Sequence, residues 1–81
     1  MRTSTHIVSI ETKKYDFTMF GFVKDPQIEG EMNSGYTLHY TDKENKDNNF
    51  IGECLDADHV YRELTHRGID NLLIDFIINF C

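Results

Sequence analysis

The side chains with the greatest chemical potential lie between residues 54 and 66. His59, Glu63 and His66 stand at positions i, i+4 and i+7, so a helix would project all three from one side. Imidazole and carboxylate groups at this spacing can bind zinc. This side is opposite Val60 and Leu64, however, so we expect it to face solvent without a fourth ligand. The pattern therefore predicts neither a metal site nor a cofactor.

Cys54 raises the question of nucleophilic catalysis, because a thiolate paired with His59 could attack an electrophile. Cys54 lies in an apolar segment, however, where a cysteine is more commonly a small core residue. No serine stands in a nucleophile-elbow context, and no glycine-rich phosphate loop occurs. A chain of 81 residues in two thin layers also rarely encloses a catalytic pocket. We therefore expect a protein without enzyme activity.

Length and composition indicate one globular domain spanning residues 1–81, because 40% of the residues are hydrophobic and 27% are charged. No apolar run of signal-peptide length follows Arg2, and no segment reaches the ~18 apolar residues of a membrane span. Cys54 and Cys81 are too few for the disulfide framework of a small secreted protein. We therefore expect a cytoplasmic protein with two reduced thiols, and the alternatives are a Cys54–Cys81 bridge or an intermolecular disulfide near the C-terminus.

Patterns of period two predict an antiparallel sheet in the first part of the chain. The segments THIVSIE (5–11), YDFTMFGFV (15–23), YTLHY (36–40) and FIGECL (50–55) each indicate a strand. A hairpin through Thr12–Lys14 would join the first two strands. The segment QIEGEM (27–32) is a weaker strand candidate, and TDKENKDNN (41–49) is polar enough to be a solvated loop.

The second strand contains an irregularity in its apolar pattern. Its parity shifts between Met19 and Phe20, and Gly21 lies beside the shift. An extra residue in a strand produces such a shift, and glycine often marks the place. We therefore predict a β-bulge in this second strand.

The period changes to that of helices after residue 55. The segment DADHVYRELTHRG (56–68) has Asp56 or Asp58 as a candidate N-cap, and Gly68 suits the left-handed position after its last turn. Asp70 can cap a second helix immediately afterwards. We therefore predict two short, consecutive helices.

The second helix carries an unusually wide apolar arc. One face, which we expect to pack on the sheet, contains Ile69, Leu72, Leu73, Phe76, Ile77 and Phe80. Ile74 and Ile78 widen the arc, so either the preceding helix covers them or they form an oligomer interface. A buried strand over LLIDFIINF (72–80) is the rival interpretation. The elements together predict an α+β, two-layer fold with an antiparallel sheet of four or five strands and two short C-terminal helices on one face.

Net charge is the clearest compositional signal, because fourteen acidic residues stand against eight lysines and arginines and give −6. A negative field repels phosphate backbones, so direct nucleic-acid binding is disfavoured. An acidic surface suits a basic protein partner, such as a nucleic-acid-binding protein or a nuclease, although it can also serve solubility alone. Expected contact residues, drawn from the acidic loops and neighbouring tyrosines, are Glu29, Glu31, Tyr36, Tyr40, Asp42, Glu44 and Asp47.

These features predict a small acidic protein-binding module without catalytic activity. Its sharpest form is an inhibitor that covers a basic, nucleic-acid-binding site on its partner. Phage counter-defence proteins and toxin-neutralising immunity proteins are similar in this general profile, which is an analogy of class only. The alternative is a structural or assembly subunit that forms homo-oligomers through its apolar C-terminal helix.

Overall fold

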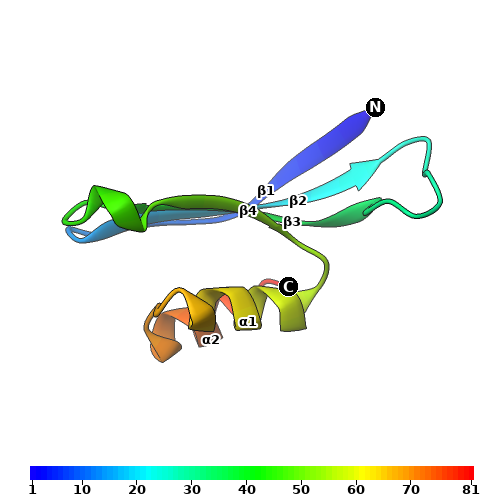
Figure 1. The fold of residues 1–81 in the computed structure, drawn as a ribbon. Coiled ribbons are helices and arrows are strands. Elements are labelled where there is room, and N and C mark those ends of the chain that lie inside the picture. Colours follow the sequence, from blue (N-terminus) through cyan, green and yellow to red (C-terminus); the bar gives the residue numbers. More distant parts are fainter.

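The computed structural model describes residues 1–81 as a four-stranded sheet followed by two helices (Figure 1). The strands pair antiparallel in chain order and are β1 (Arg2–Glu11), β2 (Tyr15–Lys24), β3 (Ser34–Asp42) and β4 (Phe50–Cys54). A 3-10 helix, η1 (Lys46–Asn48), lies in the β3–β4 loop, and α1 (Ala57–His66) and α2 (Asn71–Ile78) follow β4. The predicted α+β class is confirmed. The rival strand over residues 72–80 is wrong, and residues 27–32 lie in a loop rather than a strand.

One hydrophobic core joins the sheet to both helices. Figure 1 shows α1 and α2 on the same side of the sheet. The buried side chains of this core come from every strand and both helices: Val8, Phe17, Met19, Leu38, Tyr40, Phe50, Cys54, Val60, Leu64, Ile74 and Ile77. Full burial of one such aliphatic or aromatic side chain contributes roughly 1.5–3 kcal/mol, so this cluster is the main source of stability.

The sheet is irregular in β1 rather than in β2. Its register with β2 shifts between His6 and Val8, whereas β2 pairs with β3 without interruption. The bulge is therefore predicted in the wrong strand but at the correct position along the sheet, because the shift lies opposite Phe20 and Met19. A bulge in central β2 would disturb two ladders, whereas one in edge strand β1 disturbs a single ladder.

Two phenylalanines of β2 lie on the sheet face opposite the helices. Phe20 makes edge-to-face contacts with His6 and His39, with each pair of ring centroids 5.6 Å apart. The Arg2 guanidinium lies 4.1 Å from the centroid of Phe22 and also pairs with Glu53. This face is therefore covered by its own polar and aromatic side chains rather than by a second layer.

The two helices are separated by the turn that the sequence predicts. Asp56 and Asp70 are the N-caps, because their side chains accept hydrogen bonds from the backbone N–H groups of His59 and Leu72. Gly68 has a φ of +78°, and the next residue, Ile69, donates its N–H to the Leu64 carbonyl over 3.1 Å. This pattern ends α1 and lets α2 begin at once.

The predicted packing face of α2 is confirmed for Ile69, Leu73 and Ile77, which contact the core, and wrong for Leu72 and Phe76. Ile74 and Ile77 are fully buried and Ile78 packs against the core, whereas Leu72 is 80% exposed and Phe76 is 48% exposed. Ile74 is therefore a core residue and cannot contribute to an interface between chains while the fold is intact. The core takes the face of Ile74 because α1 packs beside α2 and widens the apolar surface that α2 can bury.

Gly35 provides a test of how closely β3 and β4 approach. A Cβ atom added at Gly35 would collide with the backbone carbonyl oxygen of Cys54, whereas one added at Gly52 would meet no atom within 4 Å. We expect Gly35→Ala to lower the free energy of unfolding by about 1–3 kcal/mol, the usual cost of overpacking. The control, Gly52→Ala, should change it by less than about 0.5 kcal/mol. Urea denaturation of both variants measures the difference, and equal stabilities would contradict the close approach.

Candidate apolar groove and acidic rim

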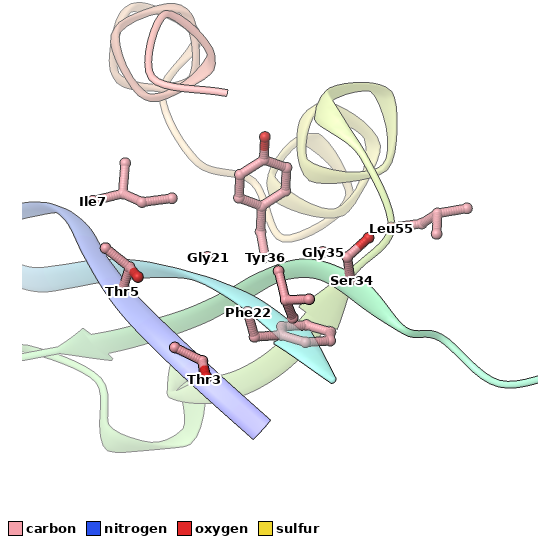
Figure 2. A pocket seen from close by; sticks show the side chains of 10 residues that line it. Thr3, Thr5, Ile7, Gly21, Phe22, Ser34, Gly35, Tyr36 and Leu55 are labelled. Carbon is pink, nitrogen blue, oxygen red and sulfur yellow. The ribbon is translucent and has the colours of Figure 1, made fainter. Parts of the chain in front are cut away.

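The largest concave site lies at the end of the sheet that the helices do not cover. It is an open groove of about 500 Å³. Its walls come from the start of β1, the end of β2, the start of β3 and the residue after β4. Figure 2 shows Tyr36 standing between Ile7 of β1 and Leu55 of the β4–α1 connection.

The local sequence explains why this end of the sheet stays open. The β1 positions that line the groove before the bulge are Thr3 and Thr5, which are too small and polar to hold a helix against the sheet. Their partners in β2 are Val23 and Gly21, and Gly21 has no side chain that could fill the space above the sheet. Ile7 lies over Gly21, where an added Cβ would come within 3.2 Å of its Cδ1. The sheet surface is therefore low at Gly21 and bounded by Ile7.

The groove is apolar and uncharged. Val23 is 51% exposed and Leu55 is 57% exposed, so both offer apolar surface to a ligand. Tyr36 is the one titratable side chain in the lining. Burial, and then the nearby Cys81 and Asp56, raise the pKa of Tyr36, so its hydroxyl stays protonated near neutral pH. The groove can thus accept apolar groups and can form hydrogen bonds through the hydroxyls of Tyr36 and its serine and threonine residues.

The β2–β3 loop places carboxylates beside the groove. Val23 and Ser34, which line the groove, flank this loop, and the exposed residues Asp25, Glu29 and Glu31 lie within it. The Asn33 side chain holds the loop, because it accepts from the Ile28 N–H over 2.9 Å and donates to the Ile28 carbonyl. We call Asp25, Glu29 and Glu31 the acidic rim.

The expected contact residues do not form one continuous face. Glu29, Glu31 and Tyr36 lie at the groove end of the sheet, whereas Asp42, Glu44 and Asp47 lie at or beyond the other end of β3. Five residues of β3 lie between Tyr36 and Asp42, which places these two residues roughly 20 Å apart along the strand. Figure 1 shows the two loops at opposite ends of the sheet.

Tyr40 is a core residue, so its expected exposure is wrong. It is only 7% exposed, and its ring stacks on Tyr15 and Phe50 at centroid distances of 5.7 and 5.3 Å. Its position two residues from an acidic loop suggested a surface role, but the helix-facing side of β3 determines its burial.

The β3–β4 loop is built around Asp42. The Asp42 carboxylate accepts hydrogen bonds from the backbone N–H groups of Glu44 and Asn45 and from the Asn48 side chain, at 2.8, 3.0 and 3.3 Å. These hydrogen bonds lower the pKa of Asp42, the one from Glu44 most. Asp42 therefore stabilises a turn, which is a sufficient reason for an acid at this position.

Lysines offset the carboxylates at this end. The Lys43 ammonium donates to the Thr12 carbonyl over 2.8 Å and lies 3.3 Å from Asp16, and the Lys43 N–H donates to the Lys14 carbonyl. The β1–β2 hairpin thus brings its own lysines against the β3–β4 loop. The full set at this end is five acids (Glu11, Asp16, Asp42, Glu44, Asp47) and four lysines (Lys13, Lys14, Lys43, Lys46). The acidic rim has two neighbouring cations, Lys24 and the N-terminal ammonium, which donates to the Asp25 carbonyl.

The residues that could do chemistry have structural roles. His59 Nδ1 accepts from the Leu55 N–H over 3.0 Å, and Glu63 pairs with Arg67 at 3.0 Å. No group of three or more His, Cys, Asp or Glu side chains is arranged to hold a metal ion. Cys54 and Cys81 are free thiols. Burial, and then Glu63, Cys81 and Asp56, raise the pKa of Cys54 to about 11, so it is not a thiolate at neutral pH.

Most of the groove lining has no distinct signal in the sequence. Ile7, Val23 and Leu55 lie in the predicted strands, and Thr3 lies before the first of them, so none of these residues has a predicted role at the surface. One signal was available, because the polar run RTSTH at the start of β1 contrasts with the mostly apolar IVSI that follows it. A strand whose first half lacks apolar residues cannot bury that half, and it leaves the opposing part of the sheet uncovered.

Comparisons with known proteins add no assignment to this geometry. No family model, no curated protein and no solved structure matches the chain. Neither α1 nor α2 has the length and apolar character needed to cross a membrane.

Proposed function

We propose that this protein is a small, non-enzymatic protein-binding module that docks a basic partner through the groove and the acidic rim. The observation that carries the proposal is their connection: the loop with three exposed carboxylates joins the two strands, β2 and β3, whose ends line the uncharged apolar groove. Such a surface is complementary to an apolar segment flanked by lysine or arginine. Its sharpest form is an inhibitor that covers the basic site of a nucleic-acid-binding protein or a nuclease.

Binding is better supported than catalysis by the chemistry of the groove. Its lining provides apolar contact from Ile7, Val23 and Leu55 and hydroxyl groups from residues such as Thr3 and Thr5. Desolvated apolar anchors surrounded by polar rims are the usual source of affinity in protein interfaces. Carboxylates at the rim of such an interface mainly increase the association rate, and added salt screens that effect.

A matched pair of charge reversals tests the proposal. We expect Glu29→Lys with Glu31→Lys to slow association with the partner by about tenfold or more at low salt, because it reverses the field beside the groove. The control, Glu44→Lys with Asp47→Lys, changes net charge equally at the other end of the sheet and should alter the rate by less than about twofold. The partner is first captured from cell lysate, and association rates are then measured by surface plasmon resonance at low and high salt.

The two double variants change charges at opposite ends of the sheet, so their association rates distinguish docking at the groove from an effect of net charge. Equal slowing by both double variants would mean that net charge alone drives the encounter, and it would contradict docking at the groove. Association that is independent of salt would contradict the electrostatic part of the proposal.

An assembly subunit is the second candidate, and the exposed stripe of α2 favours it. Leu72 is 80% exposed, and Phe76 and Phe80 are both nearly half exposed with their ring centroids 5.2 Å apart. This stripe replaces the expected interface at Ile74 and Ile78. An exposed apolar patch of this kind can mark a contact between chains.

Sedimentation distinguishes the second candidate from the first. If α2 joins two copies, the wild-type protein sediments as a dimer and Leu72→Glu with Phe76→Glu gives a folded monomer. If the groove is the docking surface, we expect a wild-type monomer and no change in partner binding by this variant. Tyr61→Glu on α1 is the control, because Tyr61 is also exposed but lies outside the stripe.

A further inference from the structure

The open side of the sheet next to the groove is the free edge of β1. β1 is first in the strand order, so β2 is its only partner. Met1 and Asp25 exchange both backbone hydrogen bonds across this pair. Because bonded and non-bonded pairs alternate in an antiparallel ladder, Thr3 and Thr5 also bond to β2. The N–H and C=O groups of Arg2, Ser4 and His6 consequently point away from the sheet.

This edge lacks most of the features that prevent strand addition. Proteins protect exposed edges with proline, lysine, short strands or bulges. The segment from Arg2 to His6 contains neither proline nor lysine, and its only bulge begins after His6. Arg2, the one charged residue of the segment, is held by Glu53 and Thr37 on the outer face. The opposite edge, β4, is only five residues long.

The residues of β1 that alternate with Arg2, Ser4 and His6 direct their side chains to the groove. Thr3 and Thr5 line it, and Figure 2 shows them in a row along β1 with Ile7. A strand paired with the free edge would follow the same alternation and direct every second side chain to the groove side of the sheet. The backbone edge and the apolar groove therefore form one composite surface.

We propose that an extended segment of the partner adds to β1 as a fifth strand, with alternate apolar side chains over the groove and its lysines or arginines at the acidic rim. This proposal rests on the proposed function and specifies the shape of the partner segment. Charge complementarity selects a basic partner over a second copy, because two copies would each bring a net charge of −6. Addition of an extended peptide to a sheet edge is a general mode of recognition in which backbone hydrogen bonds give affinity and pockets give specificity.

Ser4→Pro is the decisive variant. The Ser4 N–H points away from β2, so proline removes a free donor without removing a hydrogen bond of the sheet, and edge strands tolerate proline. The probe is a short synthetic peptide in which valine alternates with threonine and two lysines follow. We expect Ser4→Pro to weaken peptide binding by at least about tenfold, and the matched control Ser4→Ala to bind like the wild type. Circular dichroism and thermal unfolding report whether both variants keep the fold.

A second measurement keeps the test independent of any variant. In the wild-type protein, hydrogen exchange followed by NMR should show the Ser4 and His6 amides becoming protected on peptide binding, while the Thr3 and Thr5 amides are protected already. Equal binding by wild type and Ser4→Pro, or unprotected Ser4 and His6 amides in the complex, would overturn strand addition. A wild-type protein that does not bind the peptide, or that sediments as a dimer broken by Ser4→Pro, would also overturn it.

The failure of this proposal can be told apart from failure of the proposed function. If Leu55→Glu abolishes partner binding while Ser4→Pro leaves it intact, the groove is the docking surface and the added strand is wrong. If neither change affects partner binding, docking at the groove is wrong as well.

Discussion

The groove exists because the sheet is longer than the helices that cover it. β1 and β2 each have ten residues, which is roughly 33 Å of strand, whereas the ten residues of α1 rise only about 15 Å and the eight of α2 about 12 Å. Two short helices side by side can therefore cover only part of one face. The core forms where Val8, Phe17 and Leu38 oppose the helices, and the groove forms where the sheet continues past them.

This division also separates two kinds of acidic surface. At one end, Asp42 stabilises a turn and lysines from the hairpin and the loop itself offset the neighbouring carboxylates. At the other end, the acidic rim lies beside apolar side chains that remain exposed. The net charge describes neither arrangement, because it does not say which carboxylates form hydrogen bonds or ion pairs within the fold. The distribution of partners for each acid, rather than the total of −6, is what gives the groove end its proposed role.

Local patterns were sufficient for most of the fold. Period-two alternation located the four strands, and Asp56, Gly68 and Asp70 located the helix boundaries, because capping and left-handed turns depend on residues close in sequence. The buried side of α2 was only partly accessible in this way, since most of its circumference is apolar and the neighbouring α1 decides which residues are buried. The burial of Tyr40 and the strand that carries the bulge likewise depend on contacts across the sheet. The groove was missed for the same reason, because Ile7, Val23 and Leu55 come together only in three dimensions.

Whether the helices leave part of one sheet face uncovered is tested most directly by solvent paramagnetic relaxation measured on methyl groups by NMR. A soluble gadolinium chelate enhances relaxation according to how closely it can approach each methyl. We expect strong enhancement at the methyls of Val23 and Leu55 and weak enhancement at those of Leu64, Ile74 and Ile77, which are fully buried. Equally weak enhancement at Val23 and Leu55 would show that the chain itself fills the groove, and it would contradict the account.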